Sequence, residues 1–120
     1  HRQQAVAALE AGAAVVIDKP FVPTVADAEA IIAAAEAAQR PLTVFQNRRW
    51  DGDFRTLRTL VESGALGTVH RFESTFERFG APRQGTWQGQ ISPAQGGGIL
   101  FDLGSHLIDQ ALTLFGPATL

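Results

Sequence analysis

Hydrophobic residues in the first half of the chain alternate between helical stretches and short apolar runs. Residues 2–11 are rich in alanine and end at Gly12, which is typical of a helix followed by a glycine stop. The run 13–17 contains only Ala, Val and Ile, and this composition predicts a strand covered on both faces. The alanine- and isoleucine-rich stretch 25–39 predicts a second helix, and 42–46 predicts a second buried strand.

The order strand, helix, strand with short joins is typical of a parallel βαβ unit. Ligands of such sheets bind beyond the carboxyl ends of the strands. The first predicted strand ends at residues 18–20 (Asp-Lys-Pro), and the second ends at residues 47–50 (Asn-Arg-Arg-Trp). We therefore expect a lysine, an amide and two arginines at one edge of the sheet. The Lys19–Pro20 peptide bond is a candidate for the cis form, since cis bonds occur mainly before proline.

The second half of the chain has a different pattern. Residues 53–63 are amphipathic at helical spacing and predict a helix. Residues 68–79 alternate between polar and apolar positions, which predicts a half-solvated strand of an antiparallel sheet. A long loop rich in Gly, Gln and Pro follows at 80–97, and helix-forming residues return at 99–115.

Together these elements predict an α/β protein. Residues 1–50 are expected to form the second half of a doubly wound parallel sheet, and 51–120 the start of an α+β domain with an open antiparallel sheet. Two parallel strands are few for a stable buried sheet, and the antiparallel strand has no partner in view. We therefore expect an internal part of a longer protein, whose free sheet edges favour association into a homo-oligomer.

Composition excludes several kinds of function. Hydrophobic residues make up 45% and charged residues 18% of the chain, which is typical of a packed core. The net charge of −2 argues against nucleic-acid partners and anionic membranes. No apolar run approaches the roughly 18 residues of a membrane span. The absence of cysteine excludes disulfides and thiolate metal sites and is typical of a cytoplasmic protein.

One lysine and one histidine are candidate catalytic residues. Lys19 is the only lysine among ten basic residues, so either a chemical role or an ordinary solvated strand end can explain it. Asp102 and His106 are four apart on the last predicted helix and share a face with Asp109. A carboxylate beside a histidine raises its basicity, as a general base requires. The alternative is an exposed charge pair that contributes only a few tenths of a kcal/mol.

Other polar features leave more than one interpretation open. The three histidines are not at metal-ligand spacing, so no metal site is expected. Three glycines at 96–98 could cradle an anion at a helix start, or could allow a hinge or a close backbone approach. Arg48 and Arg49 could bind a phosphate, or could be one buried pair and one solvated charge. Trp50 and Trp87 are expected in core or lid packing.

Three motifs, with their order and separation, carry a resemblance that covers essentially the whole chain. They are IDKP at 17–20, NRRWD at 47–51 and GGILFDLGSHLID at 97–109. They resemble the Gfo/Idh/MocA oxidoreductases, and most of all the NADP-dependent scyllo-inositol dehydrogenase branch. Asp18 stands where the family more often has glutamate.

The resemblance implies a Rossmann-type fold, a cofactor that is NADP or NAD, and a small-molecule sugar or inositol-type polyol as substrate. It implies that Lys19 hydrogen-bonds the reacting hydroxyl, that Asp102 positions the substrate, and that His106 takes the hydroxyl proton as hydride leaves for the nicotinamide. Lys19, Pro20, Asn47 and Arg48, at the two strand ends, are expected to contact the cofactor.

The sequence lacks one part that the resemblance requires. No Gly-x-Gly-x-x-Gly follows a strand, so we expect this chain alone to bind NAD(P) weakly or not at all and to be inactive by itself. The alternative function is a non-catalytic, dinucleotide-sensing member of the same fold. Such a protein is expected to lack either Lys19 or His106, and this chain has both.

Overall fold

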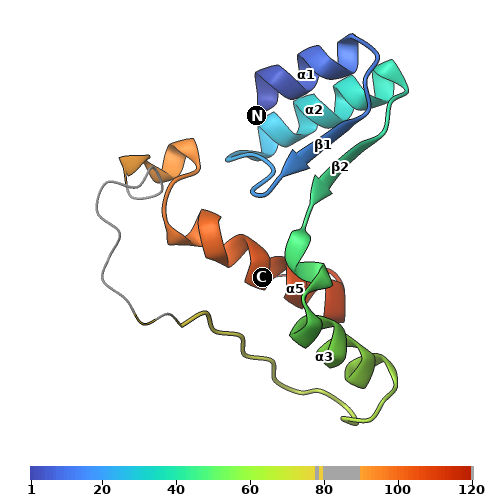
Figure 1. The fold of residues 1–120 in the computed structure, drawn as a ribbon, viewed down its shortest axis with the longest axis vertical. Coiled ribbons are helices and arrows are strands. Elements are labelled where there is room, and N and C mark those ends of the chain that lie inside the picture. Colours follow the sequence, from blue (N-terminus) through green and yellow to red (C-terminus); the bar gives the residue numbers. More distant parts are fainter. Residues whose placement is uncertain (78, 80–89, 120) are drawn as a thin grey trace.

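The first part of the chain is a helix followed by a parallel βαβ unit. The computed structural model describes residues 1–77, 79 and 90–119. Helix α1 (Arg2–Glu10) precedes strand β1 (Val15–Asp18), and helix α2 (Val25–Ala38) leads to strand β2 (Leu42–Phe45) (Figure 1). The two strands pair in parallel along their whole length. The predicted order and type of all four elements are confirmed.

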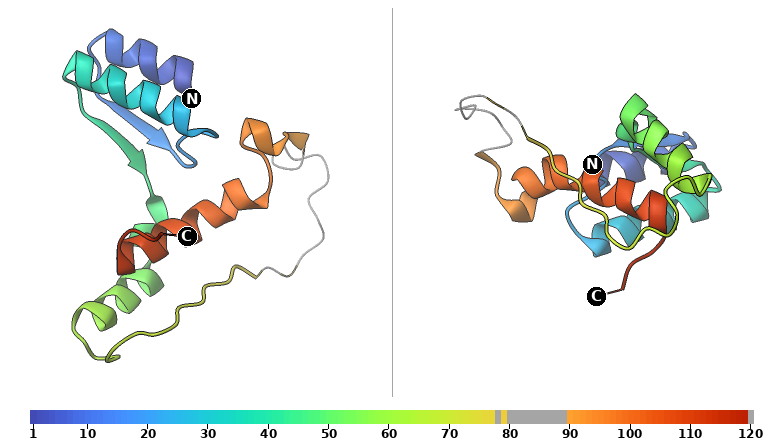
Figure 2. Two further views of the ribbon diagram at one scale, coloured as in Figure 1. Left: turned by 180° about the vertical axis from the view of Figure 1, so that it is seen from behind. Right: turned by 90° about the horizontal axis from the view of Figure 1, so that it is seen from below.

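Both helices lie on the same side of the two-stranded sheet and pack against each other (Figures 1 and 2). The side chains of β1 alternate, with Ile17 buried beneath the helices and Val16 67% exposed on the other face. The prediction that the strands are covered on both faces is therefore wrong for the described residues. The buried side chains here come from α1, β1 and α2: Ala5, Leu9, Ile17, Ile31 and Ala35.

The second part begins with a 3₁₀ turn, η1 (Asn47–Trp50), directly after β2. Helix α3 (Gly52–Glu62) follows and confirms the predicted amphipathic helix. The chain then runs on in an extended conformation (Figure 1). Trp50 is 70% exposed, so core packing, one of its two expected roles, is wrong and lid packing stays a prediction, while Trp87 lies outside the described residues.

The predicted antiparallel strand at 68–79 is not formed in the part of the chain that the structure describes. Residues 68–77 are extended, but no neighbouring segment hydrogen-bonds to them as a ladder. The alternating pattern instead directs the Phe72 ring onto Phe115, at a centroid distance of 5.2 Å. A period-two pattern predicts an extended backbone, but a strand also needs a partner. Most of the predicted loop at 80–97 lies outside the described residues, and Pro93–Gln95 form the short helix η2.

The last helix begins with a wide turn. The segment η3 (Leu100–Gly104) is π-helical and runs directly into α5 (Ser105–Phe115), so the predicted helix at 99–115 is confirmed. α5 contacts both η1 and α3 and lies between the βαβ unit and α3 (Figure 1). No helix among the described residues is long and apolar enough to cross a bilayer.

Candidate functional site

Lys19 occupies the carboxyl end of β1, where the chain turns away from the sheet. The Lys19–Pro20 peptide bond is cis, as the sequence predicted. The Lys19 ammonium reaches across to the start of the last helix. Its Nζ donates to Asp102 Oδ1 at 2.9 Å and to the Asp102 carbonyl oxygen at 2.5 Å. The Lys19 side chain is only 16% exposed and that of Asp102 is 37% exposed, so the ammonium is largely withdrawn from solvent while the carboxylate stays partly accessible.

The turn that carries Asp102 depends on a glycine. A Cβ at Gly97 would lie 1.8 Å from the carbonyl oxygen of Ile91, so no side chain fits there. Of the interpretations offered for the three glycines, close backbone approach accounts for Gly97. The Gly98 carbonyl then accepts a hydrogen bond from the Asp102 backbone N–H at 3.1 Å. Asp102 is thereby held opposite Lys19.

A small cavity of about 110 Å³ lies between the end of β1 and this turn. Lys19, Pro20 and Asp102 line it together with Asp18 and the three glycines. A more open cavity of about 370 Å³ adjoins it and shares Lys19 and Pro20. The sequence predicted that Lys19, Asp102 and His106 converge on one cleft. Lys19 and Asp102 share the small cavity, whereas His106 is not among its lining residues.

His106 is the buried residue of α5, with 4% of its surface exposed. Its ring Nδ1 has no hydrogen-bond partner among the described residues. Burial, followed by the nearby Lys19 and Arg48 cations, lowers the pKa of His106 below its usual range, and Asp102 and Asp109 only partly oppose this. The carboxylates act in the expected direction, but the expected net rise in basicity is wrong, because desolvation disfavours the imidazolium and outweighs them. The alternative of an exposed charge pair is excluded by the burial.

The buried imidazole predicts acid sensitivity of the folded state. The folded protein holds His106 neutral at a pH where the unfolded chain already binds a proton, since the unfolded pKa is about 6.5. This contribution to the free energy of unfolding is present above that pH and is lost as the pH falls through the lower folded pKa. The melting temperature of the full-length protein should therefore drop between about pH 7.5 and 5.5.

The matched comparison uses the variants His106→Gln and His70→Gln. The drop should shrink in His106→Gln, which has no group to titrate at this position. It should persist in His70→Gln, because His70 is exposed. Equal slopes for all three proteins would contradict this assignment.

The second strand end contributes residues that are already engaged with the protein. Arg48 Nη1 donates to Asp51 at 2.9 Å, and its guanidinium lies 4.9 Å from the centre of the Phe76 ring. Arg48 Nε is buried without a partner among the described residues. Arg49 pairs with Asp109, and Asn47 is exposed at the start of η1. Lys19 and Pro20 thus line the cavities, while the expected contacts of Asn47 and Arg48 with a cofactor stay predictions.

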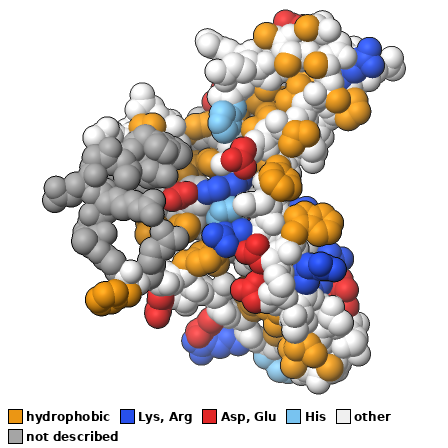
Figure 3. Space-filling model, in the orientation of Figure 1, with side chains coloured by type: hydrophobic (Ala, Val, Ile, Leu, Met, Phe, Trp, Pro, Cys, Tyr) orange, Lys and Arg blue, Asp and Glu red, His pale blue; other side chains and the backbone are white. Residues whose placement is uncertain are grey.

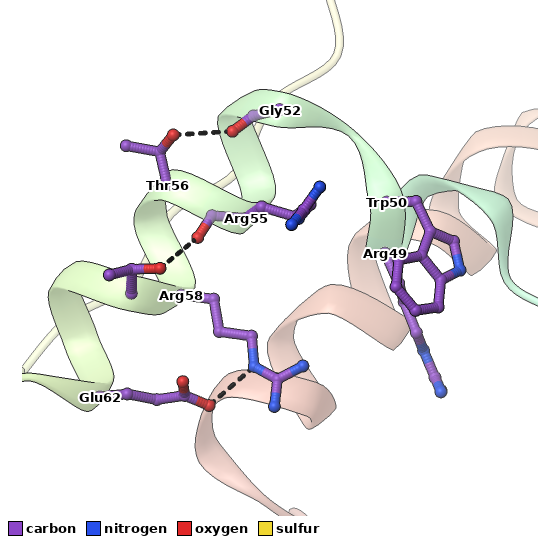
Figure 4. Close-up of a pocket in the computed structure, with 8 residues that line it drawn as sticks. Arg49, Trp50, Gly52, Arg55, Thr56, Arg58 and Glu62 are labelled. Atoms are coloured by element: carbon purple, nitrogen blue, oxygen red, sulfur yellow. Dashed lines mark hydrogen bonds and ion pairs between the residues drawn. The ribbon is translucent and has the colours of Figure 1, made fainter.

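Charged and histidine side chains gather where the βαβ unit meets the last helix (Figure 3). A larger cavity lies elsewhere among the described residues. It is open, measures about 560 Å³, and is lined by η1 and α3 (Figure 4). Its polar groups are largely paired within α3, as in the ion pair between Arg58 and Glu62 at 2.7 Å. It offers no arrangement for proton transfer. The described residues contain no group of three or more potential metal ligands.

Comparison with known proteins identifies the family of both parts of the chain. Residues 1–46 match the model described as "Oxidoreductase family, NAD-binding Rossmann fold", and residues 54–119 match "GFO/IDH/MocA C-terminal domain". The chain belongs to the Gfo/Idh/MocA oxidoreductase family. Its first part is therefore a portion of a Rossmann-type, nicotinamide-dinucleotide-binding fold, as the sequence predicted.

Individual relatives match nearly the whole chain. It is 51% identical over 116 residues to an uncharacterized oxidoreductase of Escherichia coli, covering 97% of this chain and 33% of that protein. It is 37% identical to a scyllo-inositol 2-dehydrogenase (NADP(+)) of Bacillus subtilis, with coverages of 97% and 32%. An oxidoreductase structure from Yersinia pestis superposes with a TM-score of 0.84 at 50% identity, covering 97% and 32%. The chain thus spans about a third of the length of its relatives.

Proposed function

We propose that the protein to which this chain belongs transfers a hydride between NAD or NADP and a hydroxyl-bearing carbon of a sugar or inositol-type polyol. The observation that carries the proposal is the Lys19 ammonium 2.9 Å from Asp102, with a buried, neutral His106 one helical turn further on. These three groups are a cation, a substrate-orienting carboxylate and a proton acceptor. Dehydrogenation of an alcohol can use this combination, since the reacting hydroxyl must lose a proton while negative charge develops on its oxygen.

The residues present fit the reacting end of a nicotinamide cofactor. A small cavity opens at the carboxyl end of β1, where parallel sheets bind dinucleotides, and Lys19, Pro20 and Asp102 line it. Lys19 and Pro20, with Asn47 and Arg48 at the neighbouring strand end, would hold that end of the cofactor. When bound, the nicotinamide supplies the hydride acceptor or donor. Of the two candidate cofactors we favour NADP, because the Bacillus subtilis relative is named as an NADP(+)-dependent dehydrogenase.

Each of the three residues has a separate task. The Lys19 ammonium donates to the reacting hydroxyl and stabilises negative charge as it develops on that oxygen. Asp102 accepts a hydrogen bond from a neighbouring hydroxyl and so sets the orientation of the polyol. His106 takes the hydroxyl proton at an unprotonated ring nitrogen and returns it in the reverse reaction. The proposal requires the hydroxyl to reach this ring past Asp102, one turn earlier on the helix.

The organisation of the whole protein is part of the proposal. We assign residues 1–50 to a dinucleotide-binding domain and 51–120 to the substrate domain, and the two matched ranges support this division. We further propose a cytoplasmic homo-oligomer whose partner is a small molecule, without nucleic-acid or membrane partners. The exposed apolar face of the sheet, with Val16 67% and Phe45 51% exposed, supports association with further polypeptide.

The test is a hydride-transfer assay on the full-length protein. Purified protein should reduce NAD or NADP when given scyllo-inositol, myo-inositol or an aldose, and the reverse reaction should oxidise the reduced cofactor with the corresponding ketone. One cofactor should be preferred, because a ribose-reading residue discriminates between the two. A protein that binds NAD(P) in titration calorimetry but oxidises none of a broad sugar and polyol panel would favour the non-catalytic, dinucleotide-sensing alternative.

A further inference from the structure

The last helix is joined to the first part of the chain by two long-range ion pairs. Among the described residues, Lys19–Asp102 and Arg49–Asp109 are the ion pairs that span large separations, of 83 and 60 residues. The first belongs to the candidate site. The second lies outside the small cavity, and Arg49 instead lines the open cavity on η1 and α3 (Figure 4). His106 lies between the two acidic residues along the helix.

The Arg49–Asp109 pair has the geometry of a strong contact. Arg49 Nε donates to Asp109 Oδ2 at 2.8 Å, and Nη2 donates to Oδ1 at 2.6 Å. Two parallel bonds between a planar guanidinium and a carboxylate fix orientation as well as distance. The Asp109 side chain is only 13% exposed and that of Arg49 is 48% exposed, so solvent screens the pair mainly from the guanidinium side. Hydrogen bonding to Asp109 raises the pKa of the Arg49 guanidinium.

A second contact strengthens this junction. Gln110, which follows Asp109 on α5, donates from Nε2 to the carbonyl oxygen of Arg48, which precedes Arg49 on η1, at 3.2 Å. Turn η1 directly continues β2, and β2 pairs with β1, whose end carries Lys19. The junction between η1 and α5 therefore links the helix that carries His106 to the sheet that carries Lys19.

We propose that Arg49 and Asp109 are positioning residues, which hold His106 in register with Lys19 and set its electrostatic surroundings without touching the substrate. This inference rests on the proposed function. Lys19 at the end of β1, Arg48 on η1, Asp102 on η3 and Asp109 on α5 are the charged groups that act on the His106 ring. Arg49 is not among them, so it acts on the ring through Asp109.

The two ends of the pair make opposite predictions for His106. Asp109 raises the pKa of His106, so Asp109→Asn should lower that pKa further. Arg49→Gln leaves the Asp109 carboxylate without its guanidinium, so the same pKa should rise. A pair that merely supported the fold would loosen the helix in both variants and shift the pKa in one direction, toward that of a solvated histidine.

The experiment compares full-length wild type, Arg49→Gln, Arg49→Lys and Asp109→Asn, with Arg58→Gln as the control. NMR titration of ¹³C-labelled histidine follows the pKa of His106, assigned with His106→Gln, and steady-state kinetics give kcat and both KM values. Arg49→Gln should lower kcat by about 10- to 100-fold, as misplacement of a catalytic group does, with little change in the cofactor KM. Arg49→Lys keeps the positive charge but loses the two parallel hydrogen bonds of the guanidinium, so its decrease in kcat should be smaller.

The results distinguish a failure of the positioning role from a failure of the proposed function. Arg58→Gln breaks an exposed pair within α3 and should change neither kcat nor the pKa of His106. Wild-type kcat and an unmoved His106 pKa in Arg49→Gln, or shifts of the same sign in Arg49→Gln and Asp109→Asn, would overturn the positioning role. A wild type that oxidises no polyol would overturn the proposed function alone, since the titration still decides the role of the pair. If Arg49→Gln does not fold, the Arg49→Lys and Asp109→Asn comparison carries the test.

Discussion

If the proposed function holds, replacing His106 by alanine in the full-length protein should lower kcat by roughly 10²- to 10⁴-fold, the usual contribution of a general acid–base group. The structure gives the reason, because His106 is the buried histidine next to Lys19 and Asp102, and its pKa is lowered so that the ring is neutral near pH 7. Cofactor affinity should change little, since the ring serves the hydroxyl proton. Steady-state kinetics and calorimetric titration with the cofactor measure the two quantities.

Two comparisons sharpen the His106 prediction. His70→Ala removes an exposed histidine from the extended segment and should leave kcat at the wild-type value. Added imidazole should partly restore turnover in His106→Ala, because the truncated side chain leaves a buried space of the right shape. If His106→Ala turns over substrate as fast as wild type, His106 is a structural residue and another group must accept the proton.

Replacing Lys19 by methionine should lower kcat by about 10²- to 10³-fold, the usual effect of removing one donor to a developing oxyanion. Methionine keeps most of the length of the side chain but removes the ammonium that lies 2.9 Å from Asp102. The pKa of His106 should rise at the same time, because Lys19 is one of the two cations that lower it. The acid limb of the kcat/KM profile should therefore move to higher pH.

The control for Lys19 is a cation at the opposite end of the sheet. Arg40 lies near Gly12 at the amino ends of the strands, so Arg40→Met should alter neither kcat nor the pH profile. Lys19→Arg retains the charge and should keep the acid limb near its wild-type position while still losing turnover. Retention of wild-type kcat in Lys19→Met would show that the only lysine of the chain has no role in the chemistry.

Local pattern was sufficient for every element that is stabilised by neighbours in sequence. The alanine-rich stretches formed α1 and α2, and the amphipathic spacing formed α3, because backbone bonds four residues apart need no distant partner. The βαβ order also placed Lys19 and the residues of η1 at the carboxyl ends of two parallel strands. The motif at 97–109 also predicted the family that the match to the C-terminal domain confirms.

Burial and long-range pairing could not be predicted in this way. The stretch 68–77 has the alternation of a strand but finds no ladder partner among the described residues. Leu100 at the start of the last helix is apolar yet 65% exposed, whereas the polar His106 on the same helix is buried. The face that a helix buries depends on what packs against it, and a sequence period states only that a face exists.

The sequence by itself determined the class of fold, the family and the residue types of the candidate site, because these depend on local propensity and on motifs that can be compared along a chain. Only the tertiary structure decided the protonation preference of His106 and the partner of Arg49. The preference reflects desolvation and the distances to Lys19 and Arg48, and the pairing joins residues 60 apart in sequence. The pKa of His106 and the pairing of Arg49 both depend on groups that come close only once the chain has folded.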